Sequence, residues 1–235
     1  MKLDISHKDL VRLEVDGSTL RCHGNDGNVL IYSLKGITEL WCSNNQLQTL
    51  PVLPNGLKIL RCSNNQFQSL PDLPISLKEL ACYNNRLQSL PKLPEALGWL
   101  YCNGNQLLSL PTLPNGLEVL GCSINQLQTL PILPNSLKSL ECGNNQLQTL
   151  PSLPNNLEGL FCHNNPLIFI PPLSERPKHY SVPKTLAKLQ SLENYPKYYL
   201  RYQTYFYLIT HLVLELNISP TLLSNELWWF PGIID

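Results

Sequence analysis

The sequence has little charge and no excess of either sign. Its 235 residues contain 17 basic and 17 acidic side chains, so the formal net charge at pH 7 is zero. A chain without a net positive charge has no general electrostatic attraction for nucleic-acid phosphates or for an anionic membrane surface. The composition therefore argues against both as partners.

Long hydrophobic runs are also missing. The longest strongly apolar stretch, residues 205–214, is interrupted by Thr210 and His211. It is far shorter than the roughly 20 apolar residues that cross a bilayer. The first nine residues contain acidic side chains and a histidine, where a secretory signal needs an uninterrupted apolar core. We expect a soluble protein.

Familiar signatures of enzyme chemistry are absent from the sequence. It contains no G-x-x-x-x-G-K, no H-E-x-x-H and no G-x-S-x-G motif. His163 has no second histidine or carboxylate at metal spacing beside it. We therefore predict a protein that is not an enzyme, with no catalytic residue, no metal, no cofactor and no small-molecule substrate.

What the sequence does have is a repeat of twenty residues. Its eight cysteines all occur at that spacing: Cys22, Cys42, Cys62, Cys82, Cys102, Cys122, Cys142 and Cys162. Aligned on the cysteines, residues 37–172 repeat a unit with Leu at the first, fourth, eleventh, fourteenth and seventeenth places, Cys at the sixth and Asn at the ninth. Prolines follow two of these leucines, as Pro91 and Pro94 show.

This unit resembles the leucine-rich repeat, and in particular the short bacterial subtype that carries L-P-x-L-P. Similar repeats occur in type III-secreted effectors of enterobacteria and in proteins of large amoebal DNA viruses. The resemblance implies a mostly β solenoid, a curved horseshoe with a parallel sheet on its concave side. The proline pairs predict an extended convex side, because proline fixes φ and cannot donate to a ladder.

The cysteines are predicted to be ordinary core residues. Equivalent places on adjacent parallel strands lie about 4.8 Å apart with side chains pointing the same way, which suits neither a disulfide nor tetrahedral zinc. A core position also denies a nucleophile its exposure. Free buried thiols indicate a reducing compartment, so we expect a cytoplasmic protein, or one in a host cytoplasm if it is delivered there. The ninth-place asparagines are predicted to hydrogen-bond backbone groups of neighbouring coils.

The third, fifth and seventh places of each unit alternate with the inward leucine and cysteine, so they should form the concave face. These places vary along the chain and include exposed aromatic residues, the types that dominate binding hot spots. The predicted anchor is Tyr83, Trp99 and Tyr101, with Arg61 and Glu79 as a charged rim and Trp41 and Phe161 farther out. An alternative is that the aromatic side chains only pack across neighbouring strands.

Both ends of the chain depart from the repeat. Residues 1–36 are predicted to be an N-terminal cap, with a strand, a tight turn at Asp16-Gly17, and a second strand. Leu20, Cys22 and Asn25 of this segment keep the repeat register and indicate a degenerate first coil. Residues 37–173 form the repeats, and residues 174–235 have helical spacing that predicts a helical C-terminal cap or a second interaction element.

The sequence thus predicts a non-catalytic module that binds an unidentified protein through its concave face. An alternative is an adaptor or effector whose tail docks on a larger assembly, such as ubiquitin-ligase machinery, while the repeats select the target. Several bacterial relatives look like ubiquitin ligases with a large helical domain after the repeats. Here the segment after the repeats contains no cysteine, so thioester chemistry has no nucleophile.

Overall fold

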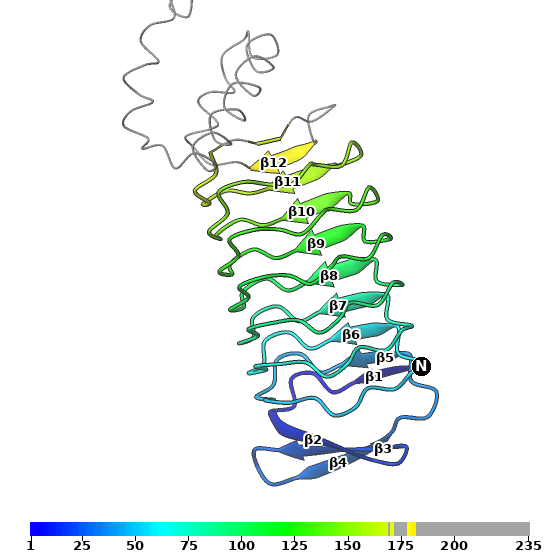
Figure 1. Ribbon diagram of the computed structural model, residues 1–235. Helices are drawn as coiled ribbons and strands as arrows, with labels where there is room; N and C mark the ends of the chain where they lie inside the picture. The colour runs from blue at the N-terminus through cyan, green and yellow to red at the C-terminus, as the bar shows by residue number, and fades with distance from the viewer. Residues whose placement is uncertain (169, 172–177, 182–235) are drawn as a thin grey trace, which may run out of the picture. The chain divides into compact units, whose positions relative to one another are not determined.

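The described part of the chain winds into a stack of coils, each with one short strand (Figure 1). The computed structural model describes residues 1–168, 170–171 and 178–181. Nine of the described strands form one parallel sheet: β1 (Lys2–Asp4), β5 (Glu39–Trp41), β6 (Ile59–Arg61), β7 (Glu79–Ala81), β8 (Trp99–Tyr101), β9 (Val119–Gly121), β10 (Ser139–Glu141), β11 (Gly159–Phe161) and β12 (His179–Ser181). The predicted parallel solenoid is confirmed.

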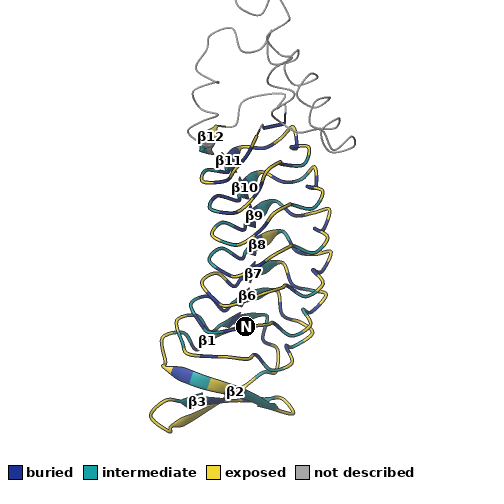
Figure 2. Ribbon diagram, turned by 60° about the vertical axis from the view of Figure 1, so that its left-hand side comes forward, coloured by how far each residue is buried: buried dark blue, intermediate teal, exposed yellow. Residues whose placement is uncertain are grey.

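The repeat register places equivalent residues side by side. Leu60 pairs with Leu80, and Leu80 pairs with Leu100, across successive parallel strands. Most of the leucines predicted to point inward are buried, among them Leu77, Leu80 and Leu87, each 0% exposed, and Leu73, Leu110 and Leu130 are partly buried. Figure 2 shows buried segments alternating with exposed ones around each coil. One coil cannot bury its leucines alone, so the stability of each coil depends on its neighbours.

The return segments are extended, as the prolines predicted. The stretches between the strands of the repeats contain no described helix, and each is closed by a turn. In one such turn the Leu57 N–H donates to the Pro54 carbonyl at 3.0 Å. Adjacent return segments are also linked, because the Gln66 N–H donates to the Leu47 carbonyl at 2.8 Å.

The ninth-place asparagines satisfy backbone groups of adjacent coils, as predicted. Asn85 Nδ2 donates to the Cys62 carbonyl at 3.2 Å and to the Cys82 carbonyl at 3.1 Å. Its Oδ1 accepts the Phe67 N–H at 3.1 Å. The same arrangement recurs from coil to coil, for example at Asn105. One amide thus closes the ladder between two coils that would otherwise leave buried polar groups unpaired.

The N-terminal segment forms a separate antiparallel sheet in the order β2 (Leu10–Asp16), β3 (Thr19–Gly24) and β4 (Val29–Ser33). The predicted strand, turn and strand are confirmed as β2 and β3, and Gly17 in the turn has a φ of 59°. The degenerate first coil stays a prediction, and the strand pairing of its residues is as follows. β3, with Leu20 and Cys22, bonds to β2 and β4, while β1 takes the place beside β5 in the parallel sheet.

The predicted helical cap, residues 174–235, lies outside the described residues except at β12. There the parallel sheet continues, since His179 pairs with Gly159 of β11. The boundaries predicted at residues 36 and 173 stay predictions. All the described residues belong to one compact unit. In the part of the chain that is described, no helix combines the length and apolarity needed to cross a bilayer.

Candidate functional site

The concave face carries a hollow over its central strands. It has a volume of about 440 Å³. Its lining consists of Ser43, Arg61, Ser63, Glu79, Ala81, Tyr83, Trp99 and Tyr101. Five of the residues predicted to bind a partner therefore meet at one place, on β6, β7, β8 and the residues that follow them.

A small residue creates this hollow. Ala81 pairs with Arg61 on one side and with Tyr101 on the other, so a methyl group lies between two long side chains. Ser63 is also small and is buried. Tyr83 and Trp99 rise around them and are 38% and 39% exposed. The result is a depression with aromatic walls.

A charged pair fixes one wall. Arg61 Nε donates to Glu79 Oε1 at 2.8 Å. This hydrogen bond raises the pKa of Arg61, so the guanidinium stays charged at any ordinary pH. Burial raises the pKa of the Tyr101 phenol, and the nearby carboxylates of Glu79 and Glu141 add to the shift. The hollow thus offers a neutral phenol and a paired cation rather than an unpaired charge.

Trp41 belongs to a neighbouring hollow that shares Ser43 and Arg61 with the first. Lys2 Nζ lies 3.2 Å from the centroid of the Trp41 ring and Arg61 Cζ lies 4.3 Å from it, so two cations contact the indole. This second hollow measures about 400 Å³. It is lined by Asp4, Ser6, His7, Lys8, Trp41, Ser43, Asn44 and Arg61. Arg61 is therefore held from two sides, by Glu79 and by Trp41.

Phe161 lies away from both hollows. It stands on β11, which is separated from β8 by β9 and β10 in the sheet order. Its ring covers Gly159, where an added Cβ would meet Phe161 Cε2 at 3.3 Å. Among the predicted residues, Phe161 is thus the one that packs on its own strand instead of joining the central group.

Sequence reasoning missed two kinds of lining residue. The small residues Ser43, Ser63 and Ala81 form the floor, and the signal for Ala81 was present as a gap between large fifth-place side chains. The residues around β1, such as Asp4 and Lys8, line the second hollow. No repeat signal marks that segment, because it joins the sheet only through pairing with β5.

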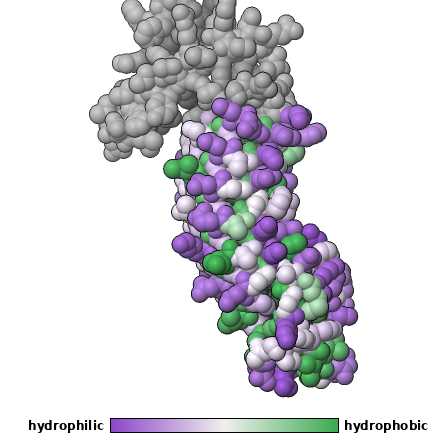
Figure 3. Space-filling model, turned by 90° about the vertical axis from the view of Figure 1, so that its right-hand side faces the viewer, coloured by the Kyte–Doolittle hydropathy of each residue, from purple (hydrophilic) through white to green (hydrophobic). Residues whose placement is uncertain are grey.

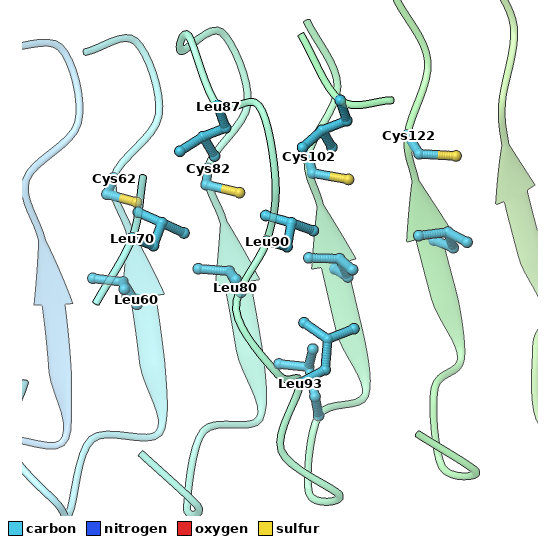
Figure 4. Close-up of a cluster of buried hydrophobic side chains, with 14 of the residues drawn as sticks. Leu60, Cys62, Leu70, Leu80, Cys82, Leu87, Leu90, Leu93, Cys102 and Cys122 are labelled. Atoms are coloured by element: carbon cyan, nitrogen blue, oxygen red, sulfur yellow. The ribbon is translucent and has the colours of Figure 1, made fainter. Parts of the chain in front are cut away.

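The cysteine column takes no part in either hollow. In Figure 4, Cys62, Cys82, Cys102 and Cys122 point the same way, one in each coil. All eight thiols are free and buried. Burial raises the pKa of Cys42 and of Cys102 to about 12. The predicted core role is confirmed, and a thiol with such a pKa is a poor nucleophile at neutral pH.

Solved structures of bacterial leucine-rich-repeat proteins are similar to this chain. The leucine-rich-repeat domain of a Shigella effector is 33% identical, with a TM-score of 0.58 over 69% of this chain and 79% of that one. YopM from Yersinia enterocolitica is 36% identical, with a TM-score of 0.61 over 62% of this chain and 33% of that one. YopM from Yersinia pestis, a leucine-rich effector protein, is 30% identical, with a TM-score of 0.51 over 64% and 55%.

The fold and these similarities define a leucine-rich-repeat solenoid. The chain belongs to the leucine-rich-repeat family, and its repeats are like those of the Shigella and Yersinia effectors. It spans about a third of the length of the Yersinia enterocolitica YopM chain and about half of the Yersinia pestis one. No protein-family model matches the chain, and a search of the curated proteins finds no match.

Proposed function

We propose that this chain is a non-catalytic module that binds a protein partner through the hollow at Ala81 on its concave face. The observation that carries the proposal is the combination of a small floor residue with two aromatic walls, Tyr83 and Trp99, that remain more than a third exposed. Large aromatic side chains around a pocket are the usual anchors of protein interfaces.

The charges around the hollow favour a protein over a polyanion. Arg61 is already paired with Glu79, and Glu39 and Glu141 add negative charge to the same face. A phosphate backbone needs several unpaired cations in a row. A peptide or protein surface can instead insert one side chain over Ala81 and place its polar groups against the rim. Similarity to effector repeat domains supports a protein partner in general.

The test is affinity capture from lysate of the native host. The wild type is compared with the variant Tyr83→Ala/Trp99→Ala/Tyr101→Ala, after circular dichroism and thermal unfolding show that both fold alike. We expect the wild type to retain a partner that the variant loses. Because hot-spot residues each contribute about 2 kcal/mol or more, the triple variant should lose nearly all binding.

A matched control removes the same number of exposed apolar side chains elsewhere. The variant Ile75→Ala/Leu108→Ala/Ile132→Ala changes residues of the return segments that are 87%, 62% and 88% exposed. It should bind like the wild type. A separate variant, Ala81→Arg, fills the hollow without removing an aromatic residue and should also abolish capture. If the partner is retained by both hollow variants, the proposal is wrong.

A further inference from the structure

The strand β4 forms an open edge of the three-stranded sheet. Among the residues that the structure describes, it pairs with β3 alone, at one end of the sheet order. Val29, Leu30 and Ile31 are 46%, 40% and 60% exposed. Natural proteins usually block such edges with lysine, proline or a bulge. Residues 29–33 contain no charged residue and no proline. Hydrophobic residues are visible among hydrophilic ones at this end in Figure 3.

The backbone groups at this edge can be assigned from the ladder. The Leu34 N–H donates to the Ser18 carbonyl at 2.6 Å, and the Gly24 N–H donates to the Asn28 carbonyl at 2.8 Å. Backbone groups in an antiparallel strand point alternately to its two sides. The even-numbered residues of β4 therefore face β3. The N–H and C=O groups of Val29, Ile31 and Ser33 point to the open edge, where no backbone partner lies within the described ranges.

The side chains of β4 divide between two faces. Tyr32 packs against the core together with Leu34, the residue after the strand. Val29 and Ile31 lie on the other face, next to Arg21 and His23 of β3. An added strand beside β4 would therefore cover apolar side chains on the outer face and continue the packed layer on the inner one.

We propose that a second copy of this chain adds its own β4 to this edge, antiparallel and centred on Ile31. In that register Ile31 faces its own copy and Val29 faces Ser33, so the outward groups of both edges bond to each other. Leu30 faces Tyr32 on the inner side. The segment is thus complementary to itself.

The charges that flank β4 also fit a second copy. Asp26 precedes the strand and Lys35 follows it. In an antiparallel pairing the end of β4 that follows Asp26 lies towards the end of the other copy that precedes Lys35, so an acidic and a basic side chain flank the interface at each end. An unrelated extended peptide can satisfy the backbone groups, but it need not carry opposite charges at its two ends as this segment does. The proposal does not depend on the function of the concave face.

The test measures the mass of the full-length protein by sedimentation equilibrium over a concentration series that reaches roughly 100 µM. The wild type should show a reversible equilibrium between one chain and two. Ile31→Lys and Ile31→Glu each place two like charges on the symmetry axis and should raise the dissociation constant roughly tenfold or more. An equal mixture of the two variants should dimerise again, because the opposite charges then face each other.

Ile75→Lys is the control, since Ile75 is 87% exposed and lies outside this sheet. It should dimerise like the wild type. A wild type that stays a single chain throughout the series overturns the proposal. Dimers that survive in each Ile31 variant alone show that the contact lies elsewhere and also overturn it. Recovery in the mixture is specific to the Ile31 register and supports it.

Discussion

At the scale of single residues, the ninth-place asparagines have the largest predicted effect on stability. Asn105 donates to the carbonyls of Cys82, Cys102 and Asn103, and its Oδ1 accepts the Leu87 N–H at 3.0 Å. Asn105→Ala leaves these buried groups without a partner and should cost about 3 kcal/mol in urea unfolding. Asn115→Ala, in an exposed turn, is the control. An equal loss for both variants would contradict the structural role of Asn105.

Ile124 is a second residue with a specific prediction. It occupies the eighth place of its coil with a φ of 56°, a left-handed conformation that β-branched residues rarely adopt. The other copies in this conformation are Asn44, Asn64, Asn84, Asn144 and Asn164, with Gly104 as the glycine. Amides in this place also bond to each other, as Asn64 Nδ2 does to Asn44 Oδ1 at 2.9 Å.

Ile124→Asn should therefore stabilise the protein by about 1 kcal/mol, because asparagine adopts the left-handed conformation at lower cost. Ile124 is 58% exposed, so little buried apolar contact is lost. The measurement is the free energy of unfolding in urea. Ile132→Asn is a matched control, since Ile132 is exposed but has no positive φ, and it should bring no gain. If Ile124→Asn lowered the free energy of unfolding, the left-handed backbone at residue 124 would not be a source of strain.

At the scale of elements, the column of buried thiols should make the protein less stable as the pH becomes alkaline. The pKa of Cys102 is about 12 in the folded chain, against an ordinary value of 9.0. Since the folded pKa of this acid is raised, the unfolded chain loses its proton first. The stabilisation from the neutral thiol is complete below pH 9 and is lost as pH rises from about 9 towards 12.

Urea unfolding with a reductant at pH 8 and pH 10 measures this effect. Each buried thiol should lower the unfolding free energy by about 1.4 kcal/mol per pH unit above its unfolded pKa. Cys102→Val removes one thiol and keeps a small apolar side chain. Between pH 8 and pH 10 the unfolding free energy of this variant should fall by less than that of the wild type, and the difference should be about 1.4 kcal/mol. An equal fall in unfolding free energy for both proteins would show that the Cys102 thiol has the same pKa in the folded and the unfolded chain.

The elements that could be predicted from sequence are those that repeat. The twenty-residue period places Leu80 beside Leu100 and sets which side chains point inward, so the parallel sheet follows from spacing alone. β1 and β4 could not be predicted in this way. β1 is three residues long and becomes a strand through pairing with β5. Cys22 matches the repeat in spacing, and β3, which carries it, pairs with both its neighbours in the antiparallel sheet.

At the scale of the whole molecule, the sequence predicts which residues lie on the concave face. It does not predict where that face is hollowed. Alternation along each strand correctly indicated that Arg61, Glu79 and Trp99 lie on one face. The hollow itself depends on which neighbours are small. Ala81 was visible as a gap between the large fifth-place residues Arg61 and Tyr101, but Ser63 does not stand out in the sequence. The same limit applies to Phe161, whose ring folds over Gly159. The binding role of these residues stays a prediction.

Photo-cross-linking most directly tests whether the hollow at Ala81 binds a protein partner. A photoreactive phenylalanine analogue replaces Tyr83 at the wall of the hollow or, as the control, Ile132 on a return segment, which is 88% exposed. Each protein is irradiated in lysate of the native host, and the cross-linked species are identified by mass spectrometry. If the hollow binds a protein, one partner should cross-link from position 83, be lost with Ala81→Arg, and be absent from position 132. A partner captured equally from both positions, or unaffected by Ala81→Arg, would contradict the account.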